Sequence, residues 1–205
     1  MVEIIETAKK LMGFDLPSGK RARRLGSLLL LSAGVLLLAY VAGSYGSMYA
    51  KQRSLMHQWE AQNLRPLSSV STPAEDRLTR LSIPKINLDV VILEGTSNEA
   101  LAQGPGHLKN TAFPGEPGNA VIAAHRDTFF RKIYELKNGD DVYVQREGRK
   151  YHYMVTSKRV VEPTDLSVLD DTGESRLTLI TCYPIHFIGP APQRLIVFAK
   201  LVKEA

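Results

Sequence analysis

Cysteine is almost absent from this 205-residue sequence, which contains a single one, Cys182. One cysteine excludes an intramolecular disulfide, so the sequence is not that of a disulfide-stabilised scaffold. The sequence also has no internal repeat, low-complexity block or heptad array. It therefore gives no sign of a solenoid or a coiled coil.

Most of the excess of positive over negative charge lies in the N-terminal region. The formal net charge is +5, but residues 1–50 contain six Lys and Arg against three Asp and Glu, which leaves the rest close to neutral. No basic stripe interleaved with aromatic residues is present, and such a stripe is the usual signature of a nucleic-acid surface. We therefore expect no nucleic-acid partner.

Charged residues are missing altogether from 25–50, where the sequence is strongly apolar. A helix of this length crosses a hydrocarbon core of about 30 Å. The basic cluster KRARR at 20–24 precedes the run, so the positive-inside rule predicts a single-pass anchor in the cell membrane with a cytoplasmic N-terminus. A cleaved signal peptide is the alternative, although its apolar region spans only about 7 to 15 residues. A buried core helix would need a polar face.

The length allows one domain with appendages. We predict a cytoplasmic segment over 1–24, an anchor over 25–49, a stalk and linker over 50–76, and a folded domain over 77–205. The linker assignment depends on the Pro- and Ser-rich string PLSSVSTPAED. A fragment beginning near Arg77 should therefore fold on its own.

The region after Arg77 consists of short β-rich runs separated by turn residues. Eight runs stand out: LTRLSI, LDVVIL, NAVIAA, DVYVQ, KYHYMVT, KRVVE, RLTLIT and RLIVFAKL. Such spacing predicts an antiparallel sandwich or barrel. The strings NEALAQG, TFFRKIYEL and PTDLSVLDD are typical of short helices, so the expected fold is mainly β with a few helical turns.

Cys182 follows a strand-like run and precedes Tyr183 and Pro184, a position at which a strand opens into a loop. A nucleophilic thiol needs a proton-transfer partner, and His125 ends another apolar run, NAVIAAH. Arg194 opens the last run and could stabilise a developing oxyanion. Taken singly, Cys182 could be an inert buried cysteine and Arg194 a solvated surface residue.

The string TLITC at 178–182 resembles the sortase signature TLxTC, and His125 in VIAAHRDTFF and Arg194 in APQRLIV resemble the catalytic His and Arg of that family. The stretch GPGHLKNTAFPGEPGNAVIAAHRDTFF is most similar to class D sortases. The resemblance covers residues 77–205. It implies a closed eight-stranded β-barrel behind an N-terminal transmembrane helix.

The resemblance also implies an activity, a cysteine transpeptidase that cleaves an LPxTG-like sorting motif through a thioacyl enzyme. The acceptor would be an amine of the cell envelope, from a peptidoglycan precursor or a pilin lysine, and no cofactor or metal is implied. The catalytic residues would be His125, Cys182 and Arg194. The residues expected to contact substrate are Thr181, Thr178, His107 and His186.

Several alternatives remain open at the level of sequence. His186 could compete with His125 as the base, His152 is expected to be structural, and Asp127 could orient His125 or stabilise a turn. The same scaffold could release its product to water as a thiol hydrolase. A membrane-tethered envelope domain without enzymatic activity is the third possibility.

Overall fold

The structure is a computed structural model that describes residues 19–63, 78–171 and 173–204. It divides into two compact units, Met1–Ser47 and Met48–Ala205. The predicted linker string at 66–76 lies outside the described residues, as do residues 1–18 of the predicted cytoplasmic segment.

The helix α2, Gly19–Asn63, contains the apolar run. Leucine-rich sequence favours a helix, and within the first unit the side chains of the described residues are exposed. The helix is long and apolar enough to cross a membrane. Length and composition therefore fit a membrane anchor, and a signal sequence would pass the same test.

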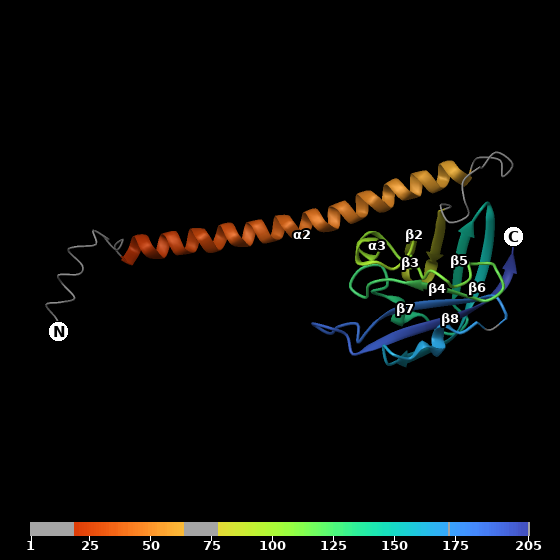
Figure 1. Ribbon diagram of the computed structural model, residues 1–205. Coiled ribbons are helices and arrows are strands. Elements are labelled where there is room, and N and C mark those ends of the chain that lie inside the picture. The colour runs from red at the N-terminus through yellow and green to blue at the C-terminus, as the bar shows by residue number, and fades with distance from the viewer. Residues whose placement is uncertain (1–18, 64–77, 172, 205) are drawn as a thin grey trace. The chain divides into compact units, whose positions relative to one another are not determined.

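The second unit contains a closed barrel of eight strands in the order β1-β2-β3-β4-β7-β8-β6-β5 (Figure 1). The strands are β1 Thr79–Ile83, β2 Leu88–Glu94, β3 Gly106–His107, β4 Asn119–Ala123, β5 Asp141–Arg146, β6 Arg149–Val161, β7 Arg176–Tyr183 and β8 Gln193–Glu204. Short helices lie between them: η3 Pro84–Ile86, α3 Asn98–Gln103, η4 Ile133–Glu135 and η5 Leu166–Leu169. The expected closed eight-stranded barrel with a few short helices is confirmed.

The strand pairing differs from the sequence-based expectation in two respects. The runs KYHYMVT and KRVVE form one strand, β6, with register shifts against β8, and the remaining strand is the two-residue β3. The barrel is also not wholly antiparallel, because β2 pairs with β3 and β4 pairs with β7 in parallel. Parallel pairing needs a long crossover connection, and the chain between β4 and β7 supplies one.

Strict alternation of buried and more exposed residues along β1 and β5 gives the barrel its core. Tyr153 on β6 is fully buried there, and its hydroxyl oxygen accepts a hydrogen bond from the Gly115 backbone N–H at 2.7 Å. Burial raises the pKa of Tyr153 to about 12, so the phenol stays neutral.

The last turns of α2 belong to the second unit and pack on the barrel. Leu55 and Trp59 are buried against Val91 of β2. The amide of Gln52 accepts from the Val91 N–H at 3.0 Å and donates to the Val91 carbonyl at 3.1 Å and to the Gln103 carbonyl at 2.9 Å. This part of the predicted stalk is therefore packed against the barrel, and the domain bounds themselves stay a prediction.

Candidate active site

The strand β7 presents Cys182 on the outer face of the barrel. Leu177 and Leu179 point into the core, so alternation along the strand places Thr178, Ile180 and Cys182 on the opposite face. Cys182 is a free, half-buried thiol. It lies one residue before the end of the strand, where the chain passes into the β7–β8 loop, residues 184–192.

The end of the strand β4 leads to His125. Parallel pairing runs to Ala123 opposite Ile180 and continues for one more residue, because the Ala124 N–H donates to the Ile180 carbonyl at 3.1 Å. The chain that carries His125 therefore leaves β4 at the level of the end of β7 that carries Cys182. A direct contact between the two side chains stays a prediction.

The strand β8 supplies Arg194 from the other side. Arg194 is the direct antiparallel partner of Cys182, and its neighbour Leu195 points into the core. Its Nη1 donates to the carbonyls of Ala191 at 3.2 Å and Gln193 at 2.9 Å. Among the residues that the structure describes, Nε and Nη2 make no hydrogen bond, so half of the guanidinium fork is available for a ligand.

The two threonines of the TLITC string are buried in the frame of this site. The Thr181 hydroxyl donates to the Ala124 carbonyl at 2.8 Å and so fixes the residue before His125. The Thr178 hydroxyl donates to Asn119 Oδ1 at 2.6 Å, and Asn119 Nδ2 donates to the Val168 carbonyl at 3.0 Å. These bonds tie β7 to β4 and η5. Substrate contact by either threonine stays a prediction.

An apolar cluster covers the outer face next to the three residues. Val168 of η5 packs there on Ile196 and Phe198 of β8, with Ile180 of β7 at its margin. The site is therefore bounded by apolar side chains on the η5 side, an environment that strengthens electrostatic interactions by excluding water.

His186 lies exposed on the β7–β8 loop, and its ring contacts Tyr134 edge-on at 6.4 Å between centroids. It borders a cavity of about 550 Å³ that Tyr183, Pro184 and Leu195 also line. Leu195 points into the barrel core, whereas Cys182 faces outward. Contact of His186 with substrate stays a prediction.

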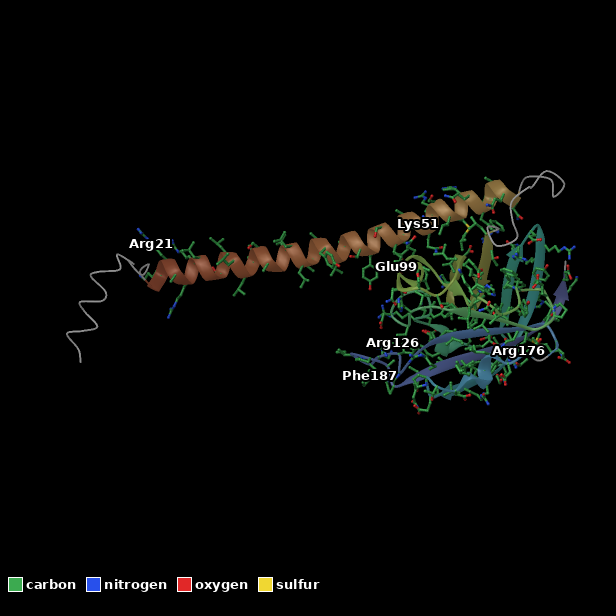
Figure 2. The ribbon with its side chains drawn as sticks, viewed as in Figure 1. Arg21, Lys51, Glu99, Arg126, Arg176 and Phe187 are labelled. Carbon is green, nitrogen blue, oxygen red and sulfur yellow. The ribbon has the colours of Figure 1, made fainter. Side chains whose placement is uncertain are left out.

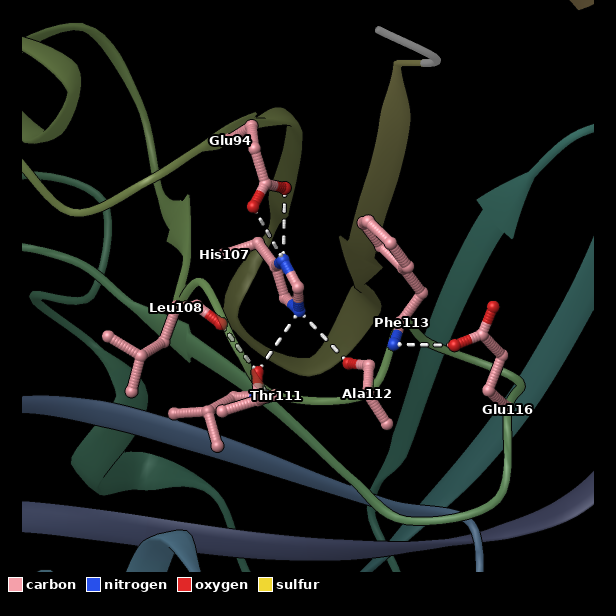
Figure 3. Close-up of polar contacts among 8 residues, drawn as sticks. Glu94, His107, Leu108, Thr111, Ala112, Phe113 and Glu116 are labelled. Atoms are coloured by element: carbon pink, nitrogen blue, oxygen red, sulfur yellow. Dashed lines mark hydrogen bonds and ion pairs between the residues drawn. The ribbon is translucent and has the colours of Figure 1, made fainter. Parts of the chain in front are cut away.

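His107 is buried in a separate cluster (Figure 3). Its Nδ1 lies 3.0 and 3.2 Å from the Glu94 carboxylate oxygens, and its Nε2 lies 2.9 Å from the Ala112 carbonyl and 3.1 Å from Thr111 Oγ1. The ring also stacks on Phe113, with centroids 4.8 Å apart. Both nitrogens thus hold β3 to β2 and to the chain that leads into β4. A substrate contact of His107 stays a prediction.

Arg126, which sequence reasoning passed over, is 7% exposed beside His125. Its Nη1 donates to the Pro184 carbonyl at 3.0 Å and its Nη2 to the Gly189 carbonyl at 2.9 Å. Asp127 is 70% exposed and lies 3.6 Å from Arg126 Nε, so the described contacts give Asp127 no bond to His125. The one sequence signal for Arg126 is its position directly after His125.

Comparison with known proteins places this arrangement in a family. The sortase domain family matches residues 81–202. Sortase D of Bacillus subtilis is 38% identical over 123 residues, which cover 60% of this chain and 62% of that protein. Sortase A of Bacillus anthracis is 29% identical over 127 residues, 60% of each chain. The match therefore spans less than two thirds of these relatives.

Solved structures give the same result. A Clostridium perfringens sortase D5 transpeptidase superposes with a TM-score of 0.61 at 29% identity, over 76% of this chain and 98% of that one. Sortase C-1 of Actinomyces oris superposes with a TM-score of 0.59 at 30% identity, over 73% of this chain and 83% of that one.

Proposed function

The chain belongs to the sortase family of cysteine transpeptidases, and from this premise we propose that it cleaves an LPxTG-like sorting motif and transfers the product to an amine of the cell envelope. The observation that carries the proposal is the strand register. Cys182 is the direct partner of Arg194, and the β4–β7 pairing reaches Ala124, the residue before His125. This register supports the inference that three groups suited to acyl transfer share one face.

The first chemical step uses Cys182 as the nucleophile. Its thiolate attacks the carbonyl carbon of the scissile amide, and a carbon–sulfur bond forms as the electron pair moves to the carbonyl oxygen. When the pair returns, the carbon–nitrogen bond breaks. His125, in its protonated form, gives its proton to the departing amine. A thioacyl enzyme and a neutral imidazole remain.

The second step reverses these roles with a new amine. His125 removes a proton from the incoming neutral amine as its nitrogen attacks the thioester carbon. The carbon–sulfur bond breaks, the thiolate leaves and the new amide is complete. Either a peptidoglycan precursor or a pilin lysine would supply such an amine.

Arg194 stabilises the charge that develops on the carbonyl oxygen in both steps. Its Nη1 is already held by Ala191 and Gln193, which orients the guanidinium before substrate arrives. A preorganised donor of this kind costs little reorganisation at the moment of reaction. Nε and Nη2, which bond to none of the described residues, have the planar geometry that suits a carbonyl oxygen.

The N-terminal helix bears on which side of the membrane the reaction takes place. The basic residues at 20–24 precede the apolar run, which favours a cytoplasmic N-terminus and an extracytoplasmic barrel in a single-pass membrane protein. A reporter fused after Ala205 should then be active only outside the cytoplasm. Activity of a cytoplasm-specific reporter at that position would reverse the topology.

Transfer and hydrolysis are separated by one experiment. The full-length chain is incubated with fluorogenic peptides of the form Leu-Pro-x-Thr-Gly, with and without an amine acceptor such as triglycine or diaminopimelate, and the products are resolved by mass spectrometry. The proposal expects the amide of the acceptor to replace the hydrolysed acid as acceptor concentration rises. Cys182→Ala should give neither product. Acid as the sole product at every acceptor concentration would make the chain a thiol hydrolase.

A further inference from the structure

The β7–β8 loop is connected to each of the three proposed catalytic residues. It begins two residues after Cys182 and ends two residues before Arg194. Near its end, the Ala191 carbonyl accepts a hydrogen bond from Arg194 Nη1. The position of this loop therefore affects both the thiol and the guanidinium.

Arg126 connects the same loop to the turn that carries His125. Its guanidinium bonds to the loop at two separate points, Pro184 at the start and Gly189 just beyond the middle. The ring of Phe187 lies over the guanidinium, 5.9 Å from Cζ to the ring centroid. Figure 2 shows Arg126 and Phe187 close together at one end of the barrel. One side chain thus spans the loop.

Placing this cation in the interior is costly. Arg126 is 7% exposed, and its acidic neighbour Asp127 is largely in solvent, so neutral carbonyls provide most of the compensation. An apolar side chain would fill the space at a lower desolvation cost. The planar guanidinium holds its donors in a fixed geometry, so its bonds to two carbonyls fix their relative positions. The arrangement therefore specifies a geometry rather than adding to packing.

We propose that Arg126 is a positioning residue, which fixes the β7–β8 loop against the His125 turn and so keeps the imidazole, the thiol and Arg194 in register. The proposal rests on the proposed function for its catalytic meaning. It also predicts a property that needs no sorting peptide, the reactivity of the Cys182 thiol. A thiol alkylates as its thiolate, and its reactivity depends on the groups that lie beside the sulfur.

The test measures alkylation of Cys182 by iodoacetamide at pH 7.5 in the full-length chain, for Arg126→Gln, Arg126→Lys and wild type. Arg131→Gln is the matched control, because Arg131 is exposed in the same turn segment. The rate is expressed per folded molecule, with thermal unfolding followed in parallel. Arg126→Gln should slow alkylation by about tenfold or more, as expected when a proton-transfer partner is displaced. Arg126→Lys should be intermediate, and the control should match wild type.

A second readout uses turnover of a Leu-Pro-x-Thr-Gly peptide. Because the Arg126 guanidinium is buried and bonded to loop carbonyls, Arg126→Gln should lower kcat by up to about a hundredfold, the effect of a displacement of about 1 Å, while KM changes little. Wild-type alkylation and kcat in Arg126→Gln would overturn the proposal. So would unfolding of both Arg126 variants beside a folded Arg131→Gln, since the role would then be structural. If Arg126→Gln is alkylated more slowly than wild type but wild type itself cleaves no peptide, the positioning role is supported. Only the proposed function is then contradicted.

Discussion

The outer face beside Cys182 and the cluster around His107 differ in how many of their polar side-chain atoms have hydrogen-bond partners. Within the described part of the chain, the His125 imidazole and the Cys182 thiol have no hydrogen-bond partner, and Arg194 uses one of its three nitrogens. Around His107, both ring nitrogens face oxygen atoms, and the Thr111 hydroxyl donates to the Leu108 carbonyl.

The difference separates groups that a ligand completes from groups that the fold completes. A buried polar atom without a partner costs about 1 to 3 kcal/mol, so a structural site satisfies its polar atoms within the chain. A reactive site leaves donors and acceptors open for substrate. Substitutions on the outer face should therefore change rates with little effect on stability, and substitutions around His107 should do the reverse.

The largest expected effect is that of Cys182→Ala. Removing the thiol should abolish peptide cleavage, and His125→Ala should lose nearly as much, because residues that act as a unit fail together. Melting temperatures should change by only a few degrees, since neither side chain holds the fold. Cleavage assays with calorimetry on both variants check this. Full turnover by the alanine variant would exclude a cysteine mechanism.

Arg194→Ala should produce the next largest effect. Loss of an oxyanion donor lowers the rate by about a hundredfold to a thousandfold, or about 3 to 4 kcal/mol, with KM little changed. Arg194→Lys keeps the charge without the planar fork and should recover part of the activity. Steady-state kinetics on one peptide decide between the models. Equal activity of lysine and arginine would show that a general positive field suffices, and a rise in KM alone would make Arg194 a substrate anchor.

Glu94→Gln tests the other side of the comparison. Removing the charge that faces His107 Nδ1 should lower the free energy of unfolding by about 1 to 3 kcal/mol, with kcat per folded molecule unchanged. Urea unfolding and active-site titration measure the two quantities. Glu135→Gln, on an exposed residue, is the control and should stay within about 0.5 kcal/mol. A loss of kcat in folded Glu94→Gln would join the two regions functionally.

Gln52→Ala should give the smallest effect. The substitution leaves the Val91 N–H and the Val91 and Gln103 carbonyls without their amide partner, although water can reach this partly buried edge. The expected loss of unfolding free energy is about 1 kcal/mol. Denaturant titration against Gln58→Ala, an exposed position on the same helix, isolates the contribution. Equal stability of the two variants would show that the Gln52 hydrogen bonds add nothing to the stability of the domain.

The sequence predicts the barrel but not which strands pair or in what register. Alternating runs such as LTRLSI and DVYVQ predict strands because the pattern of buried residues is local. The strand β3 has only two residues, Gly106 and His107, so it shows no alternating pattern. It is recognised only by its pairing with β2 and β4. The joining of KYHYMVT and KRVVE into β6 depends on a bulged register with β8. That register is a long-range property.

The residues of the candidate site show the same difference between local and long-range features. Cys182, His125 and Arg194 were predicted because each stands in a short motif, whereas Arg126 and Gln52 act through contacts with residues distant in sequence. The folding of a fragment that begins at Arg77 stays a prediction. Such a fragment lacks Leu55 and Trp59, which are buried on β2, so it should melt at a lower temperature than a fragment from Met48.

The most direct test of the central claim is intact-protein mass spectrometry of the full-length chain after brief incubation with a Leu-Pro-x-Thr-Gly peptide and no added amine. The account predicts an adduct with the mass of the acyl fragment, located on Cys182 by proteolysis and released by hydroxylamine. Cys182→Ala should carry none. Cleavage of the peptide by wild type without any such adduct, or an adduct that persists in Cys182→Ala, would contradict thioacyl transfer on the outer face of the barrel.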